Sequence, residues 1–503
     1  MDVKQFLRVV VLVVISSSGL AGQTVDFQRL FASDSDQSAG HDGPQIDPEL
    51  SALSARLDAV EAENALLRAH LVGTPVTSSS GVTLASSCDR AYSDPSGCDR
   101  CGSCQCNGDC GWIDQLSETC KEKLSWNLGN GWRIKPFGKL RGDVIYSEAP
   151  QTADAVVIFL NPRQPGISED QSTVHGKATQ LNFALTGPKC GDWSTGGLIA
   201  INFFGPQPIR NQSGANIVNA YGEIKNENWG FRFGRMTDLF GPNNPTTVNY
   251  VAQRGAGNIG IYRGAFNVDR YITWSDTMKW TLSGRISQQN ILDYTVVPAI
   301  RGKDAGWPNI ESRIGVELGR QCDFGRPVEI GLSGFIGETQ AIQDAILDSD
   351  FILLGADDIN QSRGAAIDFK FQGPKVGVRG EGWWGKAAGT YFVATLQTAN
   401  PQNNLPIESV GGWSEIYYHC SPKTTIHCGY GIDDPKDSRL GFITASDLIG
   451  QIRFNDVAWI NLFHNVTESF QVGFEVSHRD TKYLVPTFDN SGFVYHFMSQ
   501  LAY

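Results

Sequence analysis

From residue 132 to the C-terminus, apolar and polar residues alternate with a period of two, and this alternation limits the chain to β-strands with two different faces. In residues 132–146 one face is apolar and the other is charged: Trp132, Ile134, Leu140, Val144 and Tyr146 stand against Arg133, Lys135, Lys139, Arg141 and Asp143. The alternation recurs at Leu181/Phe183/Leu185, Trp229/Phe231/Phe233, Met278/Trp280/Leu282 and Phe470/Val472/Phe474/Val476. A barrel wall between lipid and water requires this pattern. A soluble antiparallel sandwich alternates too, so further features must separate the two.

The connections and the last strand favour a membrane barrel. Tight connections, such as 226–228 and 421–423, alternate with long polar ones, such as 160–179 and 342–364, as periplasmic turns alternate with outer loops. The chain ends on Phe493, Tyr495, Phe497, Leu501 and Tyr503 at period two, interrupted by Ser499. This ending resembles the C-terminal sorting signal of bacterial outer-membrane proteins, which implies recognition by the barrel-assembly machinery. At ~10 residues per strand plus turns and loops, residues 132–503 predict a closed, antiparallel, all-β transmembrane barrel of 16 strands, with 18 as the alternative. A barrel of this size encloses an aqueous channel.

The N-terminus indicates export. Lys4 and Arg8 precede an apolar run at 9–15 and then small residues, so residues 1–21 are interpreted as a signal peptide and 22–45 as a disordered linker. No later stretch approaches the ~20 apolar residues of a membrane helix. The 55 Gly, 12 Trp, 26 Phe and 14 Tyr suit many strands and turns, and a net charge of -12 argues against a nucleic-acid partner. We therefore expect a protein of the Gram-negative outer membrane.

Residues 46–72 predict a short coiled coil in the periplasm. Its apolar positions follow an unbroken 3,4 spacing: Leu50, Leu53, Leu57, Val60, Asn64, Leu67 and Leu71. An Asn at a core position specifies register and oligomer state, so Asn64 is expected to face its copies in partner chains. The alternative is a single amphipathic helix packed on the barrel. Oligomerisation is favoured because so short a helix has little stability alone.

A linker at 73–87 leads into a Cys-rich segment at 88–131. Most of the 11 Cys lie there: Cys88, Cys98, Cys101, Cys104, Cys106, Cys110 and Cys120. Behind a signal peptide, disulfides are favoured over zinc or an iron–sulfur cluster, because so small a segment needs covalent support. The pairing stays open. Cys420 and Cys428 are expected to form a disulfide that braces the hairpin end at 421–423, with a metal site beside His419 and His427 as the alternative.

The order of these parts resembles that of the DcaP-like trimeric outer-membrane porins. The resemblance rests on the exported chain, the N-terminal coiled coil, a first strand at 133–146 and a strand that runs into a loop at 230–240. It implies a homotrimer in outer-membrane lipid that passes small hydrophilic solutes and favours anions. It also implies that the loop after the second of these strands folds into the pore. The Cys-rich segment departs from the family pattern and leaves the periplasmic arrangement open.

Carried over to this sequence, the constriction loop would run from Met236 to Tyr250. The basic side of the constriction would comprise Arg133, Lys139, Arg141, Arg232, Arg235, Arg254 and Arg263, and its acidic side would comprise Asp238 and Glu223. Arginine suits an anion-selective constriction, because its guanidinium stays charged and binds carboxylate or phosphate. The alternative is that many of these charges only solvate the lumen and the loops.

No motif in the chain predicts catalysis, a cofactor or a metal centre. Residues 255–260 match the dinucleotide fingerprint letter for letter, but a strand-like stretch follows them where a helix would have to receive the pyrophosphate. Passive diffusion of solutes is therefore the leading functional hypothesis. The alternative is a structural envelope protein, in which the coiled coil and the Cys-rich segment link the outer membrane to the cell wall.

Overall fold

The computed structural model describes residues 125–503 except 154, 164–169, 206–212, 290–305, 323–324, 343–345, 348–352, 355–356 and 443–448. The predicted signal peptide, linkers and coiled coil lie outside the described residues, as do all seven cysteines assigned to the Cys-rich segment. What was predicted for those parts of the chain therefore stays a prediction.

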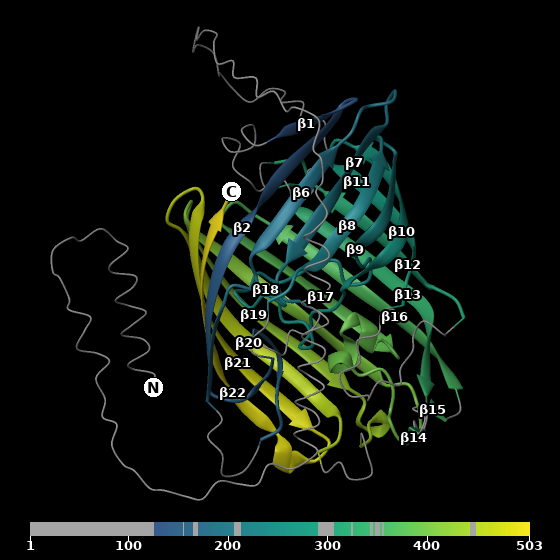
Figure 1. Cartoon of the computed structure of the whole chain (residues 1–503), viewed down its shortest axis with the longest axis vertical. Coiled ribbons are helices and arrows are strands. Elements are labelled where there is room, and N and C mark those ends of the chain that lie inside the picture. Colours follow the sequence, from purple (N-terminus) through teal and green to yellow (C-terminus); the bar gives the residue numbers. More distant parts are fainter. Residues whose placement is uncertain are drawn as a thin grey trace, which may run out of the picture. The chain divides into compact units, whose positions relative to one another are not determined.

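The described chain forms a closed antiparallel β-barrel of 16 strands, as the sequence predicts (Figure 1). Each strand pairs with the next along the chain, and β22 pairs with β2 from Lys139↔Ala502 to Ser147↔Val494 and so closes the barrel. The strands are β2 (Trp132–Ser147), β6 (Gln180–Thr186), β7 (Ser194–Asn202), β8 (Asn216–Lys225), β9 (Trp229–Thr237), β10 (Tyr262–Ser275), β11 (Met278–Ser287), β12 (Asn309–Leu318), β13 (Val328–Ile342), β16 (Asp357–Gln372), β17 (Val376–Lys386), β18 (Glu408–Ser421), β19 (Thr424–Pro435), β20 (Ile452–Asn465), β21 (Phe470–Tyr483) and β22 (Asn490–Ala502).

Shorter elements accompany the barrel strands. β5 (Gln171–His175) extends β6 along the far half of β2. β1 (Trp126–Gly129) forms a hairpin with the start of β2, so regular structure begins a few residues before the predicted barrel boundary at Trp132. The remaining elements lie in connections: β3 (Gln151–Ala153), β4 (Val156–Leu160), β14 (Ile346–Leu347), β15 (Leu353–Leu354) and the 3-10 helices η4 (Gly389–Tyr391), η5 (Val393–Leu396), η6 (Asp437–Arg439) and η7 (Pro486–Phe488). Among the described residues, no helix has the length and apolar character to cross a membrane.

The two faces of the barrel differ as the alternation predicts. On the outer face, cross-strand neighbours form apolar rows, such as Leu282, Ile314, Leu332 and Ile367 on β11, β12, β13 and β16, and all four are exposed. One residue along, β11, β12 and β13 turn polar side chains inward: Ser283, Arg313 and Ser333 are paired in the next row. An apolar exterior around a polar interior is the arrangement that a lipid surround requires.

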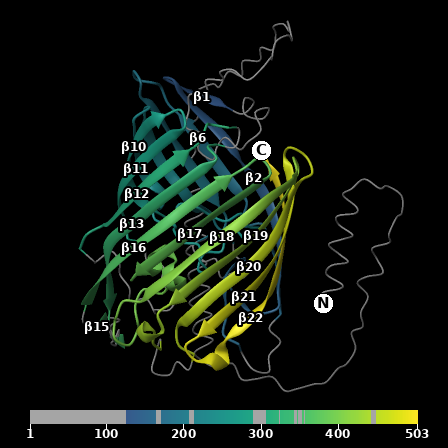
Figure 2. The same cartoon turned by 180° about the vertical axis from the view of Figure 1, so that it is seen from behind.

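The two ends of the barrel are also different. Short turns, such as 226–228 and 422–423, join the strands at the end that carries the C-terminus, which we call the short-turn end. Longer connections join them at the opposite, long-loop end (Figures 1 and 2). Numbered in order along the chain, these connections include L1 (148–170), L3 (238–261) and L6 (387–407).

Candidate functional site

L3 lies inside the barrel, and carboxylates of the wall hold its backbone in place. Four of its N–H groups each donate to a glutamate: Leu239 to Glu311 (2.8 Å), Asn243 to Glu381 (2.6 Å), Thr246 to Glu415 (2.9 Å) and Val248 to Glu475 (2.7 Å). These glutamates stand on β12, β17, β18 and β21, so the loop crosses much of the inner wall. A hydrogen bond of this kind contributes about 0.5–1.5 kcal/mol, and the four together make L3 a fixed element of the lumen.

The middle of L3 is fastened to β2, β6 and β7. Arg141 donates to the carbonyl oxygen of Val248 at 2.5 Å and forms an ion pair with Asp143 at 2.5 Å. Tyr250 accepts hydrogen bonds from Gln180 at 3.1 Å and from Asn202 at 2.9 Å. Burial raises the pKa of the Tyr250 hydroxyl, which therefore stays neutral at physiological pH. L3 thus spans the lumen from β9 to β2.

The start of L3 is fixed by a buried ion pair. Arg263 of β10 donates to both carboxylate oxygens of Asp238, at 2.6 and 2.9 Å, and both side chains are fully buried. The guanidinium carbon of Arg263 also lies 3.8 Å from the centre of the Tyr391 ring of L6. The pair therefore joins the barrel wall to two loops.

The predicted constriction residues fall into three groups. Arg141, Arg254, Arg263 and Asp238 contact or belong to L3 and are largely buried. Arg232 and Glu223 are paired across β8 and β9 on the inner face nearer the short-turn end, and Arg232 forms an ion pair with Asp269 at 2.8 Å. Arg133 and Lys139 lie on the inner face of β2, between the short-turn end and L3.

Two predictions about this region are corrected. Arg235 lies on the outer face of β9 with Phe231 and Phe233, and its Nε donates to the Ile217 carbonyl oxygen, so it does not face the lumen. The physical reason is the strand period, because an odd offset from Arg232 places a side chain on the opposite face. The folded-in loop is also longer than the predicted 236–250: Met236 still belongs to β9, and L3 continues to residue 261.

The glycines of the fingerprint-like stretch at 255–260 are closely packed: Gly255 lies against L1, Gly257 against the wall and Gly260 against Gly241 of L3 itself. The three glycines of the stretch have positive φ angles, 80° at Gly255, 101° at Gly257 and 86° at Gly260. A Cβ on Gly257 would lie 2.2 Å from the carbonyl oxygen of Gly412. The stretch leads into β10 and not into a helix, so the glycines serve close backbone approach and not phosphate binding.

Gly257→Ala is expected to destabilise the protein by about 1–3 kcal/mol, because the added methyl group must push L3 away from β18 and the residue keeps an unfavourable φ. The free energy of unfolding in urea, followed by tryptophan fluorescence, measures this change. Gly284→Ala is the matched control, since a Cβ there meets nothing within 4 Å. Equal stability of the two variants would show that L3 does not lie against β18.

The glutamates that hold L3 and the buried Arg479 of β21 were not predicted from the sequence. Arg479 donates to the carbonyl oxygen of Ile158 in L1 at 3.1 Å and also to the Gln253 side chain of L3. The sequence feature that could have found them is a charged residue at an inward-facing position of a strand whose other face is apolar. The predicted bond between Cys420 and Cys428 is wrong: within the described chain both are exposed free thiols, and Cys428 pairs in register with Ile416.

Comparison with known proteins identifies the fold. No family model matches the sequence, and no curated protein matches it. Among solved structures, the chain is similar to the outer membrane channel DcaP of Acinetobacter baumannii, with a TM-score of 0.58 and 17% identity over 76% of this chain and 100% of that chain. Weaker similarities are to OmpT of Vibrio cholerae (TM-score 0.45, 8% identity, 75% of this chain and 99% of that one) and OprB of Pseudomonas putida (0.44, 12%, 74% and 94%). The likeness to DcaP shows that the two chains share a fold.

Proposed function

We propose that the protein is an outer-membrane porin through which small hydrophilic solutes diffuse passively, with a preference for anions. The observation that carries the proposal is L3, a loop held inside a lipid-facing barrel by four wall glutamates. A loop fixed across a polar lumen limits what can pass and needs no catalytic group. The similarity to a solved outer membrane channel supports the same function.

The anion preference is supported by a basic stripe on the inner face of β2. Arg133, Lys135, Lys139 and Arg141 lie on this face on the way to L3, with Phe137 between the two lysines and with Arg141 paired to Asp143. The cross-strand positions beside the stripe are uncharged: Thr186, Ala184 and Gln180 on β6, and Gln500 on β22. A row of positively charged side chains along a wet passage raises the local concentration of anions.

The assembled protein is proposed to be a homotrimer held together by the coiled coil at 46–72 in the periplasm. The C-terminal strand ending at Tyr503 would be recognised by the barrel-assembly machinery. The apolar outer face would contact outer-membrane lipid.

Conductance in planar bilayers tests the proposed function. A porin gives large stepwise conductances, in groups of three for a trimer. A silent, folded protein that sediments with peptidoglycan would instead support the structural envelope role and would overturn the porin assignment.

Charge reversal of the basic stripe is expected to weaken the anion preference. In Arg133→Glu/Lys139→Glu, the ratio of anion to cation permeability should fall by about threefold or more, because both residues face the lumen below L3. The reversal potential in a salt gradient measures the ratio. Arg235→Ala removes a charge on the outer face and should leave it unchanged. If the control and the double variant shift the potential equally, the stripe does not set ion preference.

A further inference from the structure

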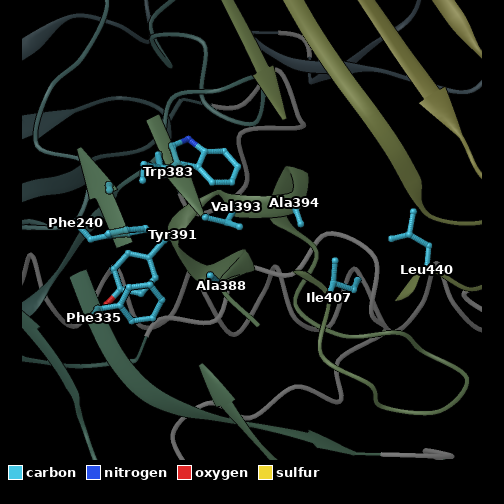
Figure 3. Close-up of a cluster of buried hydrophobic side chains, with 11 residues drawn as sticks. Phe240, Phe335, Trp383, Ala388, Tyr391, Val393, Ala394, Ile407 and Leu440 are labelled. Atoms are coloured by element: carbon cyan, nitrogen blue, oxygen red, sulfur yellow. The ribbon is translucent and has the colours of Figure 1, made fainter. Parts of the chain in front are cut away.

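L6 is a second loop packed inside the barrel, and it is buried almost completely along residues 387–400. Tyr391, Val393, Ala394 and Ile407 are each 0% exposed. Figure 3 shows Tyr391 beside Phe335 of the wall and Phe240 of L3, with ring centres 4.1 and 5.4 Å apart, respectively. The interior of the barrel therefore has an apolar core at this level.

The inner wall is apolar where L6 docks. Phe335 of β13, Ala366 of β16 and Trp383 of β17 face inward and are buried in one cluster with L6. A hydrated lumen gives no reason for apolar side chains at these positions, because their surface would remain in contact with water. Their burial under L6 indicates that the loop is docked permanently, since undocking would expose the wall and the loop together.

L6 is also bonded to L3. The Tyr391 carbonyl oxygen accepts from the Gly260 N–H at 2.9 Å, and the Thr395 hydroxyl donates to the Gly255 carbonyl oxygen at 3.1 Å. Arg263, which holds L3 through Asp238, donates to the Thr390 carbonyl oxygen at 3.1 Å. The two loops therefore behave as one packed unit.

Several wall contacts of L6 lie on the long-loop side of those of L3, whereas the Tyr391 hydroxyl donates to Glu311, which also holds L3. On β17, Glu381 holds L3, whereas a Cβ on Gly385, nearer the long-loop end, would meet Val393 of L6 at 2.9 Å. On β19, Asp433 accepts from the Thr395 N–H at 2.7 Å. On β20, Ile452 exchanges backbone hydrogen bonds with the Gln397 side chain at 2.7 and 2.8 Å. L6 thus forms a second layer across the lumen.

The backbone of L6 adopts its shape only because its surroundings impose it. Phe392, Ala394, Thr395 and Leu396 have φ angles of 67°, 53°, 50° and 69°, a left-handed conformation that costs free energy in residues other than glycine. A free surface loop has no reason to accept this cost. The apolar contacts and hydrogen bonds of the docked loop offset it.

The geometry points to L6 as a second constriction, in series with L3, that sets the size limit and the conductance of the pore. The inference rests on the proposed porin function and extends it. Ion preference is assigned to the basic stripe on β2, at the other side of L3, so size and charge selection reside in different parts of the lumen. L6 is a fixed filter, because its docking buries apolar wall and loop together.

Shortening L6 tests this assignment. Replacing residues 389–405 with a short Gly/Ser linker should raise the single-pore conductance at least about twofold and admit larger neutral polyethylene glycols, as expected when a narrow layer is removed from a water-filled pore. The reversal potential should keep its sign. Slower migration of the boiled protein on SDS gels, relative to the unboiled one, reports whether the barrel has folded.

A milder pair of variants covers the case in which the shortened protein does not fold. Tyr391→Ala removes the side chain at the centre of the cluster and should also raise conductance, whereas Leu405→Ala alters a 42% exposed side chain of the same loop and should not. If wild type conducts and neither L6 variant differs from it, L6 is not a constriction, and the porin function stands. If the folded wild type and the shortened variant are both silent, both proposals are wrong. A silent wild type with a conducting variant would show that L6 blocks the lumen instead of filtering solutes, and it would overturn the porin function.

Discussion

Asp238→Ala is expected to lower the free energy of unfolding by about 3–5 kcal/mol, the cost of leaving one member of a buried ion pair without its partner. Arg263 is 0% exposed and makes two hydrogen bonds to Asp238. The Tyr391 ring would remain beside its charge but cannot neutralise it. Glu311, the next carboxylate, already lies 3.8 Å from Arg285. Urea unfolding of the protein in detergent micelles, followed by tryptophan fluorescence, measures the loss.

A second substitution separates the unpaired charge from the lost packing. In Asp238→Ala/Arg263→Met both charges are gone, and most of the stability should return, because apolar replacement of a whole buried pair is often neutral. Arg235→Ala, on the outer face two residues from the long-loop end of the neighbouring strand, should change stability by less than about 1 kcal/mol, because the cost of an arginine on the lipid face is small near the membrane interface. If Asp238→Ala were as mild as Arg235→Ala, the ion pair would not be buried as described.

The strands were predictable because each can be recognised from the alternation of its own residues. The alternation at 229–233 or 470–476 places aromatic and aliphatic side chains on one face whatever the rest of the chain does, and the structure puts both sets on the outer face. Length divided by strand and loop size then yielded 16 strands. The same two-residue period explains the correction for Arg235. Because its offset from Arg232 is odd, Arg235 lies outside the lumen whenever Arg232 faces inward.

The partners of the two inner loops were not predictable in the same way. The N–H groups of L3 meet Glu311 and Glu475, which lie far apart in the sequence, so no local pattern joins them. One feature of the sequence indicates that the inner face of β17 is covered. Trp383 and Trp384 are adjacent in β17, and two large apolar residues in succession mean that both faces of the strand are covered there. Only the fold shows that L6 covers the inner one.

An arginine on the outer face tests the lipid surround on which every functional proposal depends. Ile314 is 51% exposed in the apolar row formed with Leu282 and Leu332. In a bilayer, Ile314→Arg should cost about 2–4 kcal/mol, because its charge would face hydrocarbon. In a soluble barrel the same change would cost almost nothing, since the side chain would extend into water. Urea unfolding in phospholipid vesicles, compared between variant and wild type, gives the difference.

The matched control places the same arginine inside the barrel. Gln471 of β21 is partly exposed on the inner face near the short-turn end, in the row that contains Gln500. Gln471→Arg should therefore change stability by less than about 1 kcal/mol, because its charge would stay hydrated. A large penalty at Ile314 with a small one at Gln471 is the signature of lipid outside and water inside. Equal penalties, or a wild-type protein that stays dispersed as a compact globule without detergent, would remove the basis for a transmembrane pore.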